Sequence, residues 1–122
     1  MRYWVGLLIC FLTLSTSVRA ETALDVQSGC RPVAAAEVTP NGVNVPPTGL
    51  KCWGAFGAVQ DLIVISDPNT NRPLLQVCAP PNSTRLQLVM IFQKYAERHP
   101  ERAHEPFGII VLEALGEAFP CR

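Results

Sequence analysis

Residues 84–100, TRLQLVMIFQKYAERHP, contain the clearest helix signal in the chain. Thr84 and Gln87 have the spacing of a capping box, in which each side chain satisfies a backbone N–H group of the other residue. Apolar residues then recur at helical spacing, at Leu86, Leu88, Val89, Met90, Ile91, Phe92 and Tyr95. His99 and Pro100 end the helix, because the residue before a proline disfavours helical backbone angles. A helix that is apolar over so much of its circumference lies inside a core or against a partner.

Two other segments show the same periodicity. Residues 51–66, KCWGAFGAVQDLIVIS, predict a helix, although their β-branched end also suits a strand. Gly54 and Gly57 each lower helix stability relative to alanine, and either the close approach of a second helix or simple tolerance accounts for them. Pro106 is well placed in the first turn of a last helix. The apolar stripe of that helix comprises Phe107, Ile110, Val111, Ala114, Leu115 and Ala118.

The remaining segments are less regular. Residues 22–37 predict one short helix around residues 24–30, interrupted by Pro32. Residues 39–48, TPNGVNVPPT, and residues 67–73, DPNTNRP, have the composition of loops. Long loops in compact domains are often used for binding. The chain therefore predicts an all-α fold, a small bundle of three to five helices.

The first 20 residues have the three parts of a secretory signal peptide. Arg2 gives a positive start, residues 3–14 are apolar and uncharged, and Val18 and Ala20 are small residues before the expected cleavage site. A spanning helix needs about 20 apolar residues, so we expect no membrane anchor. The predicted organisation is a cleaved signal peptide over residues 1–20 and one helical domain over residues 21–122, which places the protein in the periplasm.

The charge of the chain argues against a nucleic-acid partner. The chain has ten basic and ten acidic residues, and the predicted signal peptide contains two of the basic ones and no acidic one. The mature chain would then have a formal net charge of −2. Because nucleic-acid binding relies on clustered Lys and Arg, we expect no nucleic-acid partner.

Four of the five cysteines lie in the predicted mature domain: Cys30, Cys52, Cys78 and Cys121. An even number of cysteines in a small exported chain indicates disulfides. The alternative is a zinc site, but such sites usually contain cysteine pairs two to four residues apart, and no two of these cysteines are so close. The sequence therefore predicts two disulfides, with three pairings open.

The densest polar stretch is residues 97–105, ERHPERAHE, which holds both histidines and three carboxylates. Glu101 and His104 could share a helical turn and so suit a metal or acid–base chemistry. Pro100 separates the two histidines, however, and the neighbouring arginines are natural ion-pair partners for the acids. We expect a solvated connection between helices here. No motif for a catalytic residue, a metal or a cofactor is found elsewhere, so we predict that the protein is not an enzyme.

The cysteine and Phe-Pro-Cys pattern of the C-terminal half resembles the Rap/Tai family of small exported proteins. The residues that carry the resemblance are Cys78, Pro80, Thr84, Gln87, Tyr95, Pro100, Ala114, Leu115, Ala118, Phe119, Pro120 and Cys121. The stretch CWGAFGAVQD, residues 52–61, is similar to a family helix that has tyrosine where this chain has Phe56. Residues 21–50 depart from the family pattern.

The resemblance implies an immunity protein against a peptidoglycan amidase delivered by type VI secretion, often a homodimer, that plugs the amidase cleft with a projecting loop. We take residues 67–73 as the first candidate for that loop, with Asp67, Asn69, Asn71 and Arg72 as partner-binding residues, and residues 39–48 as the second. Of the three pairings, we predict Cys30 with Cys52 and Cys78 with Cys121, because the second bond would close the last two helices as a hairpin.

Two rival functions remain open from sequence alone. One is a disulfide-linked envelope chaperone or stress protein, which would have no effector partner and would hold back aggregation of unrelated proteins. The other is a small hydrolase that uses His99 or His104. An amidase-like reading frame beside this gene would favour the immunity protein.

Overall fold

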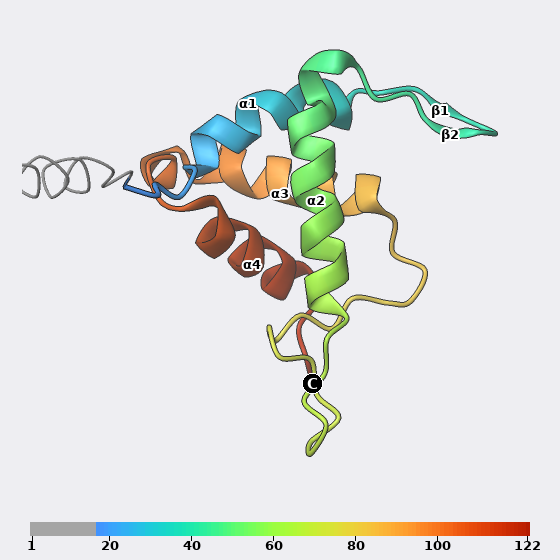
Figure 1. The fold of residues 1–122 in the computed structure, drawn as a ribbon, viewed down its shortest axis with the longest axis vertical. Helices are drawn as coiled ribbons and strands as arrows, with labels where there is room; N and C mark the ends of the chain where they lie inside the picture. Colours follow the sequence, from blue (N-terminus) through green and yellow to red (C-terminus); the bar gives the residue numbers. More distant parts are fainter. Residues whose placement is uncertain (1–16) are drawn as a thin grey trace, which may run out of the picture.

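The computed structural model describes residues 17–122. All but the last four residues of the predicted signal peptide lie outside this range. The described part contains four α-helices: α1 (Ala23–Ala34), α2 (Leu50–Ile63), α3 (Arg85–Arg98) and α4 (Phe107–Ala118) (Figure 1). It also contains the short 3₁₀ helices η1 (Pro47–Gly49) and η2 (Pro100–Arg102), and a hairpin of β1 (Val38–Thr39) and β2 (Gly42–Val43). The predicted small helical bundle is confirmed.

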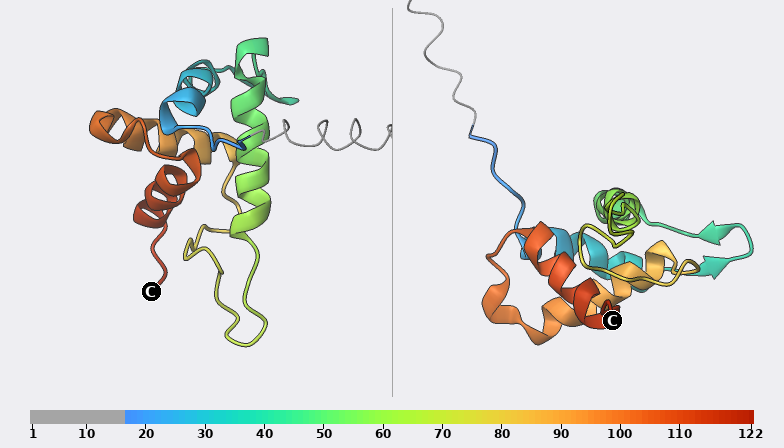
Figure 2. Two further views of the ribbon diagram at one scale, coloured as in Figure 1. Left: turned by 60° about the vertical axis from the view of Figure 1, so that its left-hand side comes forward. Right: turned by 90° about the horizontal axis from the view of Figure 1, so that it is seen from below.

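Helix α2 runs along the longest axis of the molecule, and α1, α3 and α4 lie to one side of it (Figures 1 and 2). The centre of the core is a trio of aromatic rings from three helices. The ring centroid of Phe92 lies 5.6 Å from that of Phe56 and 5.2 Å from that of Phe107. Phe56 and Phe92 are fully buried. The periodic residues of the sequence therefore do face one common core. In residues 17–122, no helix has the length and apolar character needed to cross a bilayer.

The N-terminal caps differ from the prediction. The Thr84 hydroxyl accepts a hydrogen bond from the Gln87 backbone N–H at 3.2 Å, but no bond returns from the Gln87 side chain, so only half of the predicted capping box forms. A complete capping box instead begins α1, where Thr22 and Asp25 bond each other's backbone N–H groups.

Helix α1 also continues through Pro32, where the sequence predicts an interruption. Proline removes one backbone donor, and Pro32 lies in the last turn of a helix that ends at Ala34. Cys30 and Val33 on this turn are completely buried. Their packing outweighs the loss of one hydrogen bond, and the disulfide from Cys30 to Cys52 ties the turn to α2.

The segment predicted as an irregular loop over residues 39–48 contains most of the β-hairpin, which projects from the body (Figure 1). Val38 pairs with Val43 and Thr39 with Gly42, in an antiparallel register. The Thr39 hydroxyl donates to the Gly42 carbonyl at 2.9 Å, and Gly42 has a φ of 121°, which favours glycine. Strands of two residues are too short to show any periodicity, so the sequence could not reveal them.

Two disulfides fasten the bundle, with the pairing that the sequence predicts. Cys30–Cys52 joins α1 to α2 inside the core, and both of its cysteines are buried. Cys78–Cys121 joins the segment before α3 to the segment after α4, and both of its cysteines are exposed. The two bonds therefore act in different places, one on the core and one on the surface.

Candidate partner-binding surface

The connection from α2 to α3 extends beyond the end of α2 as a narrow projection (Figures 1 and 2). Its base is closed like a β-hairpin: Ser66 forms a bridge with Pro73, and the Leu74 N–H donates to the Ile65 carbonyl at 2.9 Å. We call residues 64–77 the projecting loop. This pairing holds the two arms of the loop together.

Asp67 organises the tip of the projecting loop. Its side chain accepts hydrogen bonds from the N–H groups of Asn69 at 2.7 Å and Thr70 at 3.3 Å, which forms an Asx turn. Its backbone accepts from the Asn71 N–H and donates to the Arg72 carbonyl, each at 2.8 Å. Asn71 has a φ of 55°, a left-handed conformation that asparagine tolerates.

The structure thus brings the four sequence-predicted residues together, but gives them two different positions. The Asp67 side chain is used inside the loop to build the turn. Asn69, Asn71 and Arg72 are exposed on the outside of the tip. Their side chains offer one cation and two amides on the part of the loop beyond the bridge from Ser66 to Pro73.

The return strand of the projecting loop is attached to the end of α4. Val77 is buried and forms a bridge with Pro120, and the Cys78 N–H donates to the Phe119 carbonyl at 2.9 Å. The disulfide from Cys78 to Cys121 closes the same junction. The loop is therefore held at its base by its own pairing and at its exit by α4.

Residues 97–105, the densest polar stretch, form an ion-pair network. The Arg102 guanidinium bonds both Glu105 carboxylate oxygens at 2.8 Å and also contacts Glu113 on α4. The Tyr95 hydroxyl donates to Glu113 at 3.1 Å, and burial raises the pKa of this phenol. The predicted pairing of an arginine in this stretch with its acids is confirmed for Arg102, whereas Arg98 pairs with Glu117 on α4.

The histidines are not brought together into a site. His99 lies 3.2 Å from Glu101, and His104 is exposed. Among residues 17–122, no three His, Cys, Asp or Glu side chains are arranged to hold a metal ion. The ion-pair network joins α3 to α4 through Tyr95, Arg102 and Glu113.

Acid is expected to weaken the attachment that Arg102 provides. Its hydrogen bonds hold the pKa of Glu105 and of Glu113 below the ordinary value of 4.5. Because these pKa values are lower in the folded chain, the stabilisation is complete above pH 4.5 and is lost as the pH falls through the folded values. Thermal melts should show Tm falling from about pH 5 to pH 3.

The variant Arg102→Gln should lower Tm at neutral pH and flatten this acid dependence. The matched control is Arg31→Gln, an exposed arginine that takes part in none of the ion pairs of residues 17–122. An unchanged pH profile in Arg102→Gln would show that the network does not couple pH to stability.

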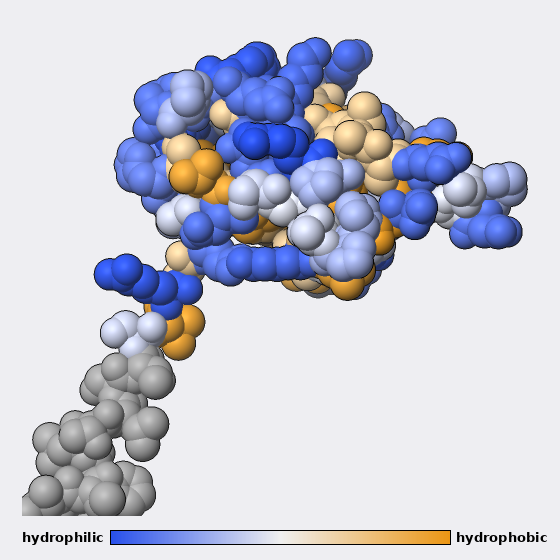
Figure 3. Space-filling view, turned by 90° about the horizontal axis from the view of Figure 1, so that it is seen from above, coloured by the Kyte–Doolittle hydropathy of each residue, from blue (hydrophilic) through white to orange (hydrophobic). Residues whose placement is uncertain are grey.

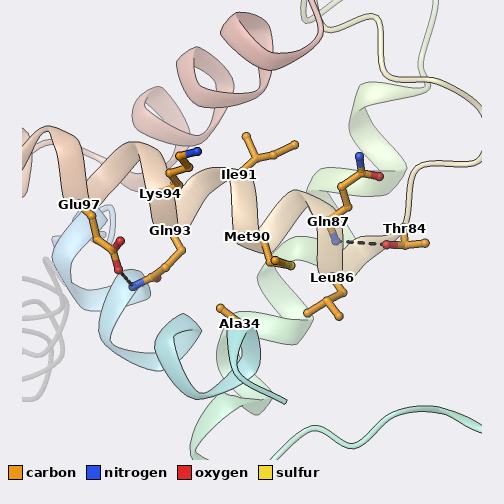
Figure 4. Close-up of a pocket in the computed structure, with 9 residues that line it drawn as sticks. All are labelled: Ala34, Thr84, Leu86, Gln87, Met90, Ile91, Gln93, Lys94 and Glu97. Carbon is orange, nitrogen blue, oxygen red and sulfur yellow. Dashed lines mark hydrogen bonds between the residues drawn. The ribbon is translucent and has the colours of Figure 1, made fainter. Parts of the chain in front are cut away.

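Apolar side chains also remain on the surface. Leu86 and Met90 lie on the side of α3 that faces Ala34 of α1 (Figure 4), and Met90 is 52% exposed. A second groove, between α2 and α4, is lined almost entirely by apolar residues: Ala55, Ala58, Val59, Leu62, Leu75, Phe107, Val111 and Leu112, with Gly108. We call it the α2–α4 groove.

A family model described as Rap1a immunity proteins matches residues 22–121. The chain belongs to the Rap1a immunity protein family. The match begins at Thr22, so it covers almost all of residues 21–50, the segment whose sequence departs from the family pattern. No curated protein and no solved structure matches the chain. Membership in the Rap1a family implies an immunity role in which the chain binds a cognate effector.

The structure also brings together surface residues that sequence reasoning missed. Trp53 of α2 and Arg85 of α3 are 32 positions apart, and the sequence pattern marks neither of them as part of a site. In the folded chain the Arg85 guanidinium carbon lies 4.9 Å from the centroid of the Trp53 ring. No local pattern in the sequence could have indicated this contact.

Proposed function

We propose that this Rap1a family member is a periplasmic immunity protein that binds a peptidoglycan amidase effector of type VI secretion and blocks its active-site cleft. The observation that carries the proposal is the projecting loop, a narrow and internally bonded element held at both ends on an immunity-family fold. Inhibition of this kind works by occupying the substrate groove. It requires no catalytic group in the inhibitor.

The construction of the loop suits insertion into a cleft. An inhibitor that is ordered before binding loses less conformational entropy when it binds. The Asx turn at Asp67, the bridge from Ser66 to Pro73 and the disulfide at Cys78 all fix the tip in advance. Asn69, Asn71 and Arg72 then present hydrogen-bond donors to the walls of the cleft.

The proposed location follows from the cysteines and the predicted signal peptide. Disulfides persist in oxidising compartments such as the bacterial periplasm, and this chain contains two of them, one in the core and one on the surface. The peptidoglycan substrate of an amidase lies in the same compartment. We propose that residues 1–20 direct export and are removed there.

We also propose that two copies pair through the α2–α4 groove. Large apolar patches on a soluble protein commonly mark an interface. Leu62 at this groove is 50% exposed. Light scattering of the purified chain measures the mass directly, and a monomer at all concentrations would contradict the pairing.

The decisive test is a titration of a purified amidase effector with this chain while peptidoglycan cleavage is measured. We expect activity to fall linearly to zero at one chain per effector. Arg72→Ala should weaken binding about tenfold by removing the exposed cation of the tip, since arginine is a frequent hot-spot residue. Asp67→Ala should weaken it at least as much, because the turn then loses the two bonds to its side chain.

The control for both variants is Arg31→Ala, an exposed arginine on α1 outside the loop, which should bind like the unaltered chain. Binding is measured by calorimetry, and circular dichroism checks that each variant is folded. Full inhibition by a chain that carries both loop substitutions would contradict the assignment of the loop, and no complex with any amidase effector would contradict the function.

A further inference from the structure

Arg85, the first residue of α3, packs its side chain against α2. Its Cζ atom lies 4.9 Å from the centroid of the Trp53 ring, which is a cation–π contact. Its Nε atom donates a hydrogen bond to the Gln60 side-chain oxygen at 3.3 Å. Both contacts come from α2, so together they hold the guanidinium against that helix.

Gly57 leaves the space in which the guanidinium lies. A Cβ atom at this position would come within 3.2 Å of both Cζ and Nη1 of Arg85, and within 3.3 Å of Nη2. At Gly54, one turn away on the same helix, a Cβ atom would meet nothing within 4 Å. The two glycines of α2 thus have different explanations. Gly57 makes room for an arginine from α3, and Gly54 is tolerated.

Arg85 forms no ion pair within residues 17–122, since none of the five ion pairs of this range includes it. In the same part of the chain, Nη1 and Nη2 have no hydrogen-bond acceptor, since the only bond from this side chain comes from Nε. An arginine presents these two donors as a fork that matches the oxygens of a carboxylate.

The fork lies in a groove between the helices and the hairpin. One wall of the groove comes from α2 and the start of α3, and the other comes from the hairpin. The helix wall contains Trp53, Gln60, Thr84, Arg85 and Leu86, and the hairpin wall contains Val38, Gly42 and Val43. We call this the Arg85 groove; its volume is ≈ 490 Å³. Val38 is 66% exposed. Seen from above, apolar atoms gather on the body beside the projecting hairpin, between polar areas (Figure 3).

We propose that the Arg85 groove binds an acidic side chain of the effector, with an apolar neighbour of that residue packed against Trp53 and the hairpin valines. The choice of occupant rests on charge complementarity, because the chain supplies a fixed cation without an anion. Tryptophan and arginine are also the residues most enriched among interface hot spots. This inference rests on the proposed function, to which it adds a second contact that selects the effector by its sequence.

The two contacts are compatible with one partner. Residues 78–84 run from the projecting loop to the start of α3 on the side of the molecule from which the hairpin projects (Figure 1). The hairpin and the projecting loop extend from opposite ends of α2 (Figure 1), so we expect a partner that contacts both to lie along the length of that helix.

The first test needs no effector. The chain labelled with ¹⁵N is titrated with the peptide Ac-Leu-Glu-Leu-NH₂ and, separately, with Ac-Leu-Gln-Leu-NH₂. We expect the Arg85 Nε and Trp53 indole signals to shift with the glutamate peptide and to stay in place with the glutamine peptide. Equal shifts with both peptides, or no shift with either, would overturn the inference of a carboxylate site.

The second test uses the effector complex. We expect Arg85→Gln to weaken binding at least tenfold and Arg85→Lys to weaken it less, because lysine keeps the charge and loses the fork. Gly57→Ala should also weaken binding by displacing the guanidinium, whereas Gly54→Ala should not. Arg31→Gln controls for loss of a positive charge elsewhere, and thermal melts confirm that each variant is folded.

The two proposals fail in different ways. If the unaltered chain forms no complex with an amidase effector, the proposed function is wrong, and the peptide titration still decides whether the groove binds a carboxylate. If the complex forms and Arg85→Gln binds as tightly as the unaltered chain, the loop alone recognises the effector and the groove has no part in it.

Discussion

Replacing Cys78 and Cys121 together by serine is expected to weaken binding of the effector about 100-fold while the four helices stay formed. This disulfide lies at the exit of the projecting loop, where both cysteines are exposed. Without it, one bridge at Val77 and one hydrogen bond from Cys78 hold the return strand to the end of α4. Ordering the backbone of each freed residue again on binding costs about 1–2 kcal/mol, so a few such residues account for the loss.

The measurement separates affinity from stability. Calorimetry gives the change in Kd, circular dichroism gives the helix content, and hydrogen exchange reports whether residues 64–77 have become mobile. A disulfide that closes 43 residues is also worth about 4 kcal/mol in the chain-entropy model. Because this loss lowers the stability of the variant, the double serine substitution and its parent are both made in a Gly54→Ala background. Gly54→Ala should raise the free energy of unfolding by about 0.5–1 kcal/mol, because a Cβ atom there meets nothing within 4 Å.

The other disulfide provides the contrast. Cys30 and Cys52 are buried between α1 and α2, so their replacement by alanine should lower Tm strongly and leave the affinity of the molecules that remain folded unchanged. Loss of affinity in this variant and full affinity in the Cys78/Cys121 variant would reverse the assignment of the two bonds.

Replacing Phe92 by alanine is expected to lower the free energy of unfolding by about 3–5 kcal/mol, the usual cost of removing a buried phenylalanine. Phe92 is completely buried and is one of three rings that join α2, α3 and α4. Since small domains are stable by about 5–15 kcal/mol in total, this is a large fraction of what holds the protein together. This loss of unfolding free energy has two sources: the favourable burial of the ring away from water is removed, and a cavity remains that the other two rings cannot fill.

Urea unfolding followed by circular dichroism measures this loss, and the matched control is Ile109→Ala. Ile109 is 48% exposed on α4, so its removal should cost less than about 1 kcal/mol. A loss under about 1.5 kcal/mol for Phe92→Ala would mean that the rings collapse into the space, and that their packing is looser than the centroid distances indicate.

The helices could be predicted because their signals are local. The stripe that contains Phe92 repeats over four turns, and Pro100 and Pro106 mark where one helix ends and the next begins. The same local reasoning failed at Pro32, because a general rule about proline gave no weight to the burial of Cys30 and Val33 around it.

In the candidate site, too, the local features could be predicted from the sequence and the contacts between helices could not. The tip of the projecting loop could be predicted from its composition, since Asp67, the asparagines and the flanking prolines are turn residues. The contact of Trp53 with Arg85 could not be predicted, because it exists only after α2 and α3 have packed. For Gly57 the sequence leaves two explanations open, the close approach of a second helix and simple tolerance. The structure supports the first, because Arg85 of α3 occupies the space beside it.

The pairing of the cysteines also makes the two bonds independent of each other. Each bond joins cysteines that are consecutive along the chain, so neither bond encloses a cysteine of the other. The Cys78–Cys121 bond is exposed and the Cys30–Cys52 bond is buried. A mild reductant is therefore expected to release the end of the projecting loop while the bond inside the core stays closed.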